Sequence, residues 1–220
     1  MTRLPVRRRT RQKQTETADL KLHSYVIEHD LGFAPNPFFG ACTLACCKPD
    51  IRKQAKLGDI VMGTGSAKLG RQGHLSYWMR VDTIINFDEY WGDPRFVLKK
   101  PAMRGSAMQR HGDNIYHRDA ETGAWQWLDS FHSEPGGECS ASNLKRDTGR
   151  TDKVLVGYDF AYWGAKGPKI PDALSDFVVK RQGWKCNFSP ERLAAMLDWL
   201  DAQPERGYLG EPADWQRIAL

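Results

Sequence analysis

The sequence lacks several features that would assign it to a broad class of proteins. No apolar run approaches the roughly 20 residues that a membrane span needs, and no secretory signal core is present. The five cysteines are odd in number, and two of them are adjacent, which is not the framework of a disulfide-rich secreted domain. We therefore expect a cytoplasmic protein with reduced thiols and no contact with a membrane.

A basic surface over the whole chain is also missing, although the formal net charge is +5. The first thirteen residues hold six Lys or Arg and no acid, which leaves 26 basic against 27 acidic residues in the rest. Residues 1–20 carry few large apolar side chains, so we expect a disordered basic arm there and a single globular domain over 21–220. Such an arm can hold phosphates without specificity, or it is merely solvated.

The order of elements excludes regular strand-helix alternation. Strands are predicted at 23–28, 60–62, 75–85 and 153–158, a hairpin around 121–123, and short helices after Pro49 and near 87–91. Residues 129–152 are loop-like by composition. Ser189 and Pro190 start the clearest helix, with apolar residues at helical spacing up to Pro204. We expect an α+β fold built round a small curved β-sheet or barrel, with short helices and a C-terminal helix.

The sequence has no complete phosphate-binding loop, because Gly63-Thr64-Gly65-Ser66 leads into a polar loop and a strand rather than a helix. Gly-rich backbone does let a flat ligand approach, with Thr64 and Ser66 to read its edge. A bend needed for sheet closure is the alternative.

Thiols near a helix start suggest a second chemistry. Cys46 and Cys47 lie just before Pro49, close to Lys48 and Arg52, where positive charge favours the thiolate. His29 and Asp30 in the preceding loop could supply a base and its orienting carboxylate. Buried, inert thiols are the alternative reading. The histidines are scattered and no second ligand pair accompanies the cysteines, so we expect no metal and no cofactor.

Aromatic residues make up 11% of the chain, and several stand beside short polar residues in loop-like segments. An aromatic wall with an amide or hydroxyl in reach can stack on an unpaired base and pair with its edge, although Trp and Tyr are also ordinary core residues. The candidates for base contacts are Asn36, Phe38, Thr64, Ser66, Trp78, Asn114 and Tyr116. The candidates for phosphate contacts are Lys48, Arg52, Arg95, Lys99 and Lys100.

The run from Tyr25 to Ser66 resembles the nucleotide modification associated domain family, second type, in its Tyr-Val-Ile-Glu-His-Asp start, its Cys-Cys-Lys-Pro segment and its Gly-Thr-Gly-Ser end. Asp93-Pro94-Arg95-Phe96 and Gly112-Asp113-Asn114-Ile115-Tyr116 are later marks of the resemblance. It implies a link to modified nucleotides in bacteria or phages, without an established reaction. A looser similarity to PUA-like folds implies a small barrel that reads modified bases.

Three functions follow as hypotheses. The first is a nucleic-acid or nucleotide binding module that accepts a base, modified or not, in an aromatic and polar pocket. The second is an enzyme acting on a nucleotide or base, with Cys46 or Cys47 as nucleophile, His29 as base and Asp30 orienting it. The third is a structural or interaction component of a modification or defence system.

Overall fold

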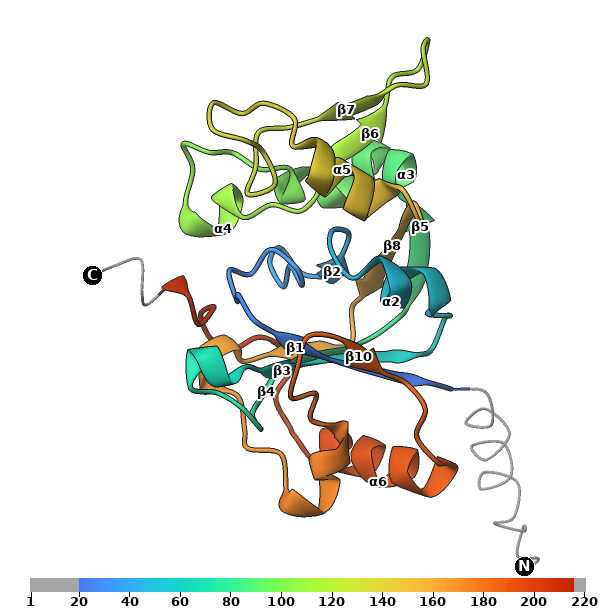
Figure 1. Ribbon diagram of the computed structural model, residues 1–220, viewed down its shortest axis with the longest axis vertical. Coiled ribbons are helices and arrows are strands. Elements are labelled where there is room, and N and C mark those ends of the chain that lie inside the picture. Colours follow the sequence, from blue (N-terminus) through green and yellow to red (C-terminus); the bar gives the residue numbers. More distant parts are fainter. Residues whose placement is uncertain (1–19, 216–220) are drawn as a thin grey trace, which may run out of the picture.

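A six-stranded mixed sheet crosses the middle of the computed structural model, which describes residues 20–215 (Figure 1). In spatial order its strands are β10 (Trp184–Lys185), β1 (Leu22–Ile27), β3 (Ile60–Gly65), β4 (Leu75–Arg80), β9 (Phe160–Tyr162) and β11 (Gly207–Tyr208). β1 runs parallel to β3, whereas β4 is antiparallel to both β3 and β9. Every residue of β1 and β3 is buried, because both faces of the sheet are covered.

One face of this sheet is covered by α6 (Pro190–Asp201) together with η4 (Asp172–Phe177), whereas η3 (Gly164–Lys166) follows β9. The Ser189 side chain accepts a hydrogen bond from the backbone N–H of Arg192 and so caps α6, while Leu193, Met196 and Leu200 are buried in the core. The predicted C-terminal helix is confirmed. The short η1 (Ala67–Leu69) follows β3.

The other face of the sheet meets a second, antiparallel sheet of β2 (Cys42–Leu44), β8 (Lys153–Gly157) and β5 (Thr83–Asn86), beside which α2 (Pro49–Gln54) lies. The single strand predicted over 75–85 is therefore wrong, since β4 and β5 belong to different sheets. The chain changes sheet at Asp82, whose carboxylate accepts hydrogen bonds from the backbone N–H groups of Tyr158 and Asp159.

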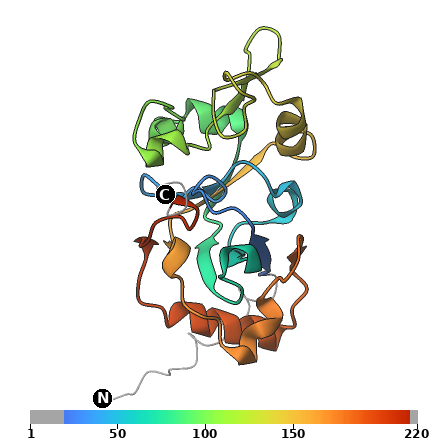
Figure 2. The ribbon, with the colours of Figure 1, turned by 60° about the vertical axis from the view of Figure 1, so that its left-hand side comes forward.

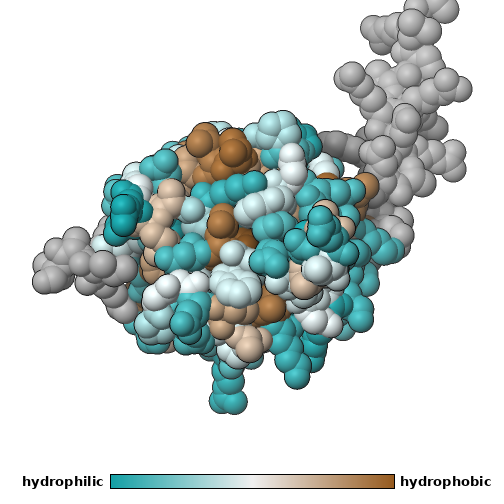
Figure 3. Space-filling view, turned by 90° about the horizontal axis from the view of Figure 1, so that it is seen from above, coloured by the Kyte–Doolittle hydropathy of each residue, from teal (hydrophilic) through white to brown (hydrophobic). Residues whose placement is uncertain are grey.

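A third layer lies beyond the second sheet (Figures 1 and 2). It contains α3 (Phe87–Gly92), η2 (Pro94–Lys99), α4 (Ala107–Arg110), the hairpin of β6 (Tyr116–Arg118) and β7 (Trp125–Trp127), and α5 (Ala141–Thr148). The helical turn near 87–91 and the hairpin are confirmed. Seen from above, the outer surface of the molecule on this side is mostly hydrophilic with separate hydrophobic patches (Figure 3).

The loop-like prediction for residues 129–152 is wrong in its second half, where α5 forms. The helix has one large apolar residue, Leu144, which packs against the core of the third layer. Because Ser, Asn, Asp and Thr are weak helix formers, the segment carries little helical signal of its own, and tertiary packing decides its structure.

The α+β class is confirmed, with several sheets and short helices. The described residues form no closed barrel, so the barrel alternative and the PUA-like likeness are not supported. Within 20–215, no helix combines the length and the apolar character needed to cross a bilayer. The predicted basic arm lies, apart from Leu20, outside the described residues.

Candidate active site

The chain turns sharply between β2 and α2, and Cys47 lies in this turn. Cys47 (φ 58°) and Lys48 (φ 43°) both have left-handed backbone conformations, which residues other than Gly adopt rarely. Pro49 then occupies the first turn of α2. Two such residues in succession cost free energy that surrounding contacts must offset, and strain of this kind is concentrated at functional sites.

Two side chains from distant parts of the sequence lie next to Cys47. Its Sγ lies 3.6 Å from Nε2 of His132, and Nδ1 of His132 lies 2.7 Å from Oδ2 of Asp147. A carboxylate can only accept, so Nδ1 carries the hydrogen and Nε2 is the acceptor, with the thiol and a terminal nitrogen of Arg146 both within reach of it. The second oxygen of Asp147 accepts the backbone N–H of Cys47 at 2.8 Å. One carboxylate thus orients both the imidazole and the turn that carries the thiol.

The titration behaviour of His132 and Asp147 fits an ion pair. Burial by itself would lower the pKa of His132, but its hydrogen bonds to Asp147 and Cys47 outweigh burial and raise this pKa. Burial would raise the pKa of Asp147, but the hydrogen bond and charge of His132, and those of Arg146, lower it. The imidazole is therefore a stronger base than free histidine, beside a carboxylate that stays ionised.

Two arginines hold this arrangement. Arg52 is fully buried and donates to the backbone carbonyls of Cys47 (2.9 Å), Lys153 (2.8 Å) and Asp147. Arg146 donates from Nε to Oδ1 of Asp147 at 3.0 Å and places a terminal nitrogen 3.0 Å from Nε2 of His132. Arg52 therefore links the thiol turn to α5, and Arg146 adds a partly exposed positive charge at the imidazole.

The thiol faces a cleft of about 520 Å³. The cleft lies between the end of β1, the start of α2, the loop before α5 and the segment before β10. Cys47 and His132 line it, with apolar walls that include Phe33, Phe131 and Trp184. The ionisable side chains around it are Glu28, His29, Lys48, Asp50 and Arg146. Cys47 and His132 are thus accessible to a small ligand, whereas Asp147 is fully buried.

A metal ion has one candidate position among the described residues, where Cys46, His132 and Asp147 place ligand atoms within 4.8 Å of one another. The thiol of Cys46 instead donates to the carbonyl of Asp113 at 3.6 Å, and burial raises its pKa well above the usual value. With Arg146 beside the same carboxylate, this surrounding disfavours a further cation. The donor set fits proton transfer better than metal binding.

The structure distributes the predicted catalytic residues differently from the sequence hypothesis. His29 lies at the cleft, 61% exposed, with Nδ1 3.8 Å from Asp214. Asp30 is buried, accepts hydrogen bonds from the Tyr162 hydroxyl and the Ala213 N–H, and its pKa is raised by burial. The predicted pairing of His29 with Asp30 is therefore absent. The side chains that lie beside Cys47, where the hypothesis placed His29 and Asp30, are His132 and Asp147.

The predicted base-contacting residues do not converge on one site. Asn36 and Asn114 are fully buried and donate to the backbone carbonyls of His111 and Tyr90. Thr64 donates weakly to the carbonyl of Tyr25 within the sheet. Trp78 and Tyr116 belong to two different cores, and Ser66 caps η1. These six residues are buried and serve the packing or hydrogen bonding of the fold. Of the seven candidates, Phe38 alone lines a cavity, which is described below.

The predicted phosphate contacts are also dispersed. Lys48 lines the cleft, but Arg52 and Lys99 are fully buried and bind backbone carbonyls, so neither can reach a surface phosphate. Burial lowers the pKa of Lys99 to about 8. Arg95 is paired with Asp93 at the surface, and Lys100 lies 3.6 Å from the centre of the Trp91 ring.

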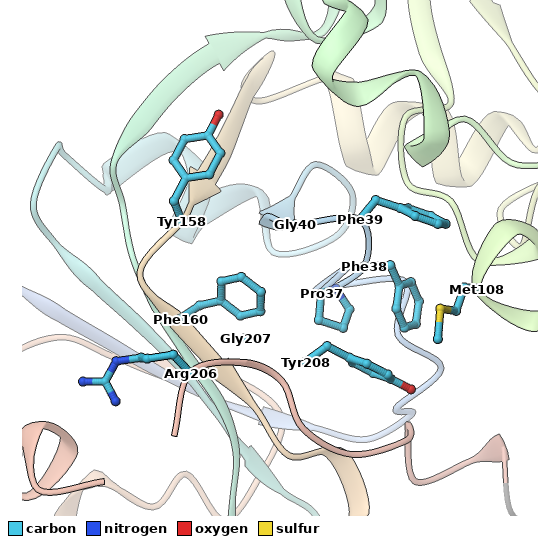
Figure 4. A pocket seen from close by; sticks show the side chains of 10 residues that line it. All are labelled: Pro37, Phe38, Phe39, Gly40, Met108, Tyr158, Phe160, Arg206, Gly207 and Tyr208. Atoms are coloured by element: carbon cyan, nitrogen blue, oxygen red, sulfur yellow. The ribbon is translucent and has the colours of Figure 1, made fainter. Parts of the chain in front are cut away.

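An aromatic cavity of about 350 Å³ lies elsewhere, at the edge of the six-stranded sheet (Figure 4). Five aromatic residues contribute to its lining: Phe38, Phe39, Tyr158, Phe160 and Tyr208. Arg206 lies at one side of the cavity and pairs with Asp159, with Nε 3.0 Å from Oδ1.

Sequence reasoning missed His132 and Asp147 because both lie in the segment interpreted as a loop. A signal was present in Ser130-Phe131-His132-Ser133, since the Ser130 hydroxyl accepts the N–H of His132 at 3.2 Å and fixes that turn.

The chain was compared with known proteins. Neither the curated proteins nor the solved structures gave a match. The family model described as nucleotide modification associated domain 2 matches residues 19–219, which covers the sheets, the cleft and the aromatic cavity. The resemblance carried by Tyr25 to Ser66 is confirmed, and the chain belongs to the nucleotide modification associated domain 2 family.

Proposed function

We propose that this protein is an enzyme of nucleotide modification that uses Cys47 as its nucleophile, His132 as general base and Asp147 to orient the imidazole. The observation that carries the proposal is the continuous contact from Sγ through the imidazole to the carboxylate, at 3.6 and 2.7 Å, in a strained turn open to a cleft. Nucleophile, base and orienting group within reach of one another are the requirements of covalent catalysis.

The reaction class that this geometry serves best is acyl transfer on a nucleotide or base. The thiol proton moves to Nε2 of His132 as sulfur bonds to a carbonyl carbon of the substrate. The tetrahedral intermediate collapses, and the leaving amine or alcohol takes the proton back from His132. Water or an amine then attacks the thioester, gives its proton to His132, and Cys47 leaves as thiolate and is reprotonated.

Positive side chains can stabilise the charge that develops on the carbonyl oxygen. The backbone N–H of Cys47 is occupied by Asp147, so it is not available as a donor. Lys48 and Arg146 line the same cleft. Burial lowers the pKa of Lys48, whereas for Arg146 the hydrogen bond to Asp147 outweighs burial and raises the pKa. We assign these two cations to the oxyanion or to an acidic group of the substrate.

Thiol alkylation tests the nucleophile. Iodoacetamide applied to the folded protein, followed by peptide mass spectrometry, compares Cys47 with Cys186, which is also partly exposed. We expect Cys47 to react several-fold faster near neutral pH, with the advantage lost in His132→Gln. Equal rates at both thiols would contradict the proposal.

An activated ester tests the chemistry itself. With p-nitrophenyl acetate we expect a burst of p-nitrophenolate that approaches one equivalent of protein, together with an acetyl group on Cys47. The burst should be absent from Cys47→Ser and retained in Cys186→Ser. A burst unchanged in Cys47→Ser would assign the reaction to another group.

The aromatic cavity favours a second candidate function, the binding of a base. A flat ring could lie among Phe39, Tyr158 and Tyr208, the aromatic side chains around this cavity (Figure 4). Titration with nucleosides, followed by tyrosine fluorescence, tests this in the parent and in Tyr158→Ala, a 46% exposed side chain whose loss leaves the core intact.

A further inference from the structure

A second cavity adjoins the cleft that Cys47 faces. Its volume is about 630 Å³, and it is lined by residues 175, 176 and 178–185. Gln182, Gly183 and Trp184 line both cavities. The two cavities therefore share the wall that residues 182–184 form at the start of β10.

The charge of this second cavity is predominantly positive. Lys180, Arg181 and Lys185 line it and are exposed. The single acid in its lining, Asp176, already pairs with Arg192. Among the described residues, Lys180 and Arg181 have no hydrogen-bond or ion-pair partner, and Lys185 donates only to the backbone carbonyl of Asp176. Cations without partners beside a concave surface are available to a polyanion.

We propose that the substrate of the Cys47 cleft is one nucleotide of a nucleic-acid strand, and that the adjoining phosphates of that strand lie along Lys180 and Arg181. This inference rests on the function proposed for Cys47 and adds the substrate class, a single strand rather than a free nucleotide. Lys48 and Arg146 line the cleft together with the acids Glu28 and Asp50, and Asp50 is paired with Arg150.

The dimensions and the lining suit one residue of a strand. A volume of about 520 Å³ accommodates one nucleotide, and the apolar side chains Phe131 and Trp184 offer rings against which an unstacked base can lie. A free nucleotide would leave Lys180 and Arg181 without a role, because they line the neighbouring cavity and not the cleft.

Binding can be measured without the chemical step, using full-length Cys47→Ala. Fluorescence anisotropy compares labelled single-stranded dT12 and rU12, which distinguish DNA from RNA, with competition by dTMP and UMP. The test variant adds Lys180→Ala and Arg181→Ala. Its matched control adds Arg104→Ala and Lys166→Ala, two exposed cations that line neither cavity.

We expect the test variant to bind the preferred oligonucleotide at least fivefold more weakly than the control. The slope of log affinity against log salt should decrease by about 1.4, since each single-strand phosphate contact contributes about 0.7. Equal binding by test and control variants, or a monophosphate that competes as strongly as the oligonucleotide per mole, would overturn the proposal. Loss of strand binding leaves the thiol results untouched, so the two proposals fail separately.

Discussion

The guanidinium of Arg52 donates a 2.9 Å hydrogen bond to the carbonyl of Cys47, the first of two residues with left-handed backbone. The same side chain also binds two other carbonyls and is fully buried. Arg52, which the sequence analysis predicts as a phosphate contact, therefore binds backbone inside the protein and holds the turn of Cys47 against α5.

Replacing Arg52 should destabilise the fold strongly. Arg52→Met removes the donors of three backbone carbonyls and a buried cation near Asp147, and each unsatisfied group costs about 1–3 kcal/mol. We expect a loss of about 3 kcal/mol or more in urea unfolding. The control Arg150→Ala breaks an exposed pair with Asp50 and should cost less than about 1 kcal/mol. Equal effects would show that Arg52 is not a structural element of the turn.

Neutralising Asp147 should slow the thiol. Asp147→Asn keeps the size of the side chain but removes the ionised acceptor whose hydrogen bond, and then whose charge, raises the pKa of His132 against burial. We expect alkylation of Cys47 at neutral pH to fall several-fold, because the imidazole becomes a weaker base when its pKa falls. The control is Asp129→Asn, which neutralises an exposed carboxyl that does not line the cleft. Unchanged alkylation would remove Asp147 from the proposed mechanism.

Stability should depend on pH through His132. Because its pKa in the folded protein is raised above 6.5, its contribution is fully present below pH 6.5 and is lost as pH rises through the folded value. Asp147, with its pKa lowered below 3.8, contributes above that pH and loses its contribution as pH falls through the folded value. The stability advantage of the parent over His132→Gln should therefore be largest between about pH 4 and 6.5 and decrease above it.

His117 gives a control of opposite sign, because burial lowers its pKa. The parent should lose stability relative to His117→Gln as pH falls through 6.5. Urea unfolding at intervals from pH 4.5 to 8.5 measures both differences. A pH-independent difference for His132→Gln would contradict the ion pair with Asp147.

Close backbone packing should make Gly167 irreplaceable. A Cβ at this position would lie 1.5 Å from the carbonyl oxygen of Leu75, a backbone atom of β4. We expect Gly167→Ala to prevent folding or to cost more than about 4 kcal/mol. Gly92→Ala, where a Cβ meets nothing within 4 Å at the end of α3, should be neutral or slightly stabilising. Thermal unfolding by circular dichroism distinguishes the two outcomes.

Local signals allowed part of the fold to be predicted. The Ser189-Pro190 start of α6 and the hairpin turn at Glu121-Thr122-Gly123 depend on neighbouring residues, and both are confirmed. The change of sheet at Asp82 and the helix α5 depend on contacts with segments far away in the sequence. The residues near Asp82 and within α5 do not predict these contacts.

The site divides in the same way. Cys47 could be named from its position before Pro49, because helix starts and nearby cations favour thiolate chemistry. His132 and Asp147 are 85 and 100 residues away along the chain. The adjacent His29 and Asp30 were the nearer pair, but the buried Tyr162 and the C-terminal segment engage Asp30 instead.

Cys47 and its proposed base belong to different layers. Cys47 lies in the turn from β2 to α2, while His132 and Asp147 come from the segment that includes α5 (Figure 1). Separation of these layers would disconnect sulfur from imidazole while the six-stranded sheet and α6 remain intact. Heat inactivation should therefore precede the main unfolding transition, and a ligand that bridges the cleft should bring the two temperatures together.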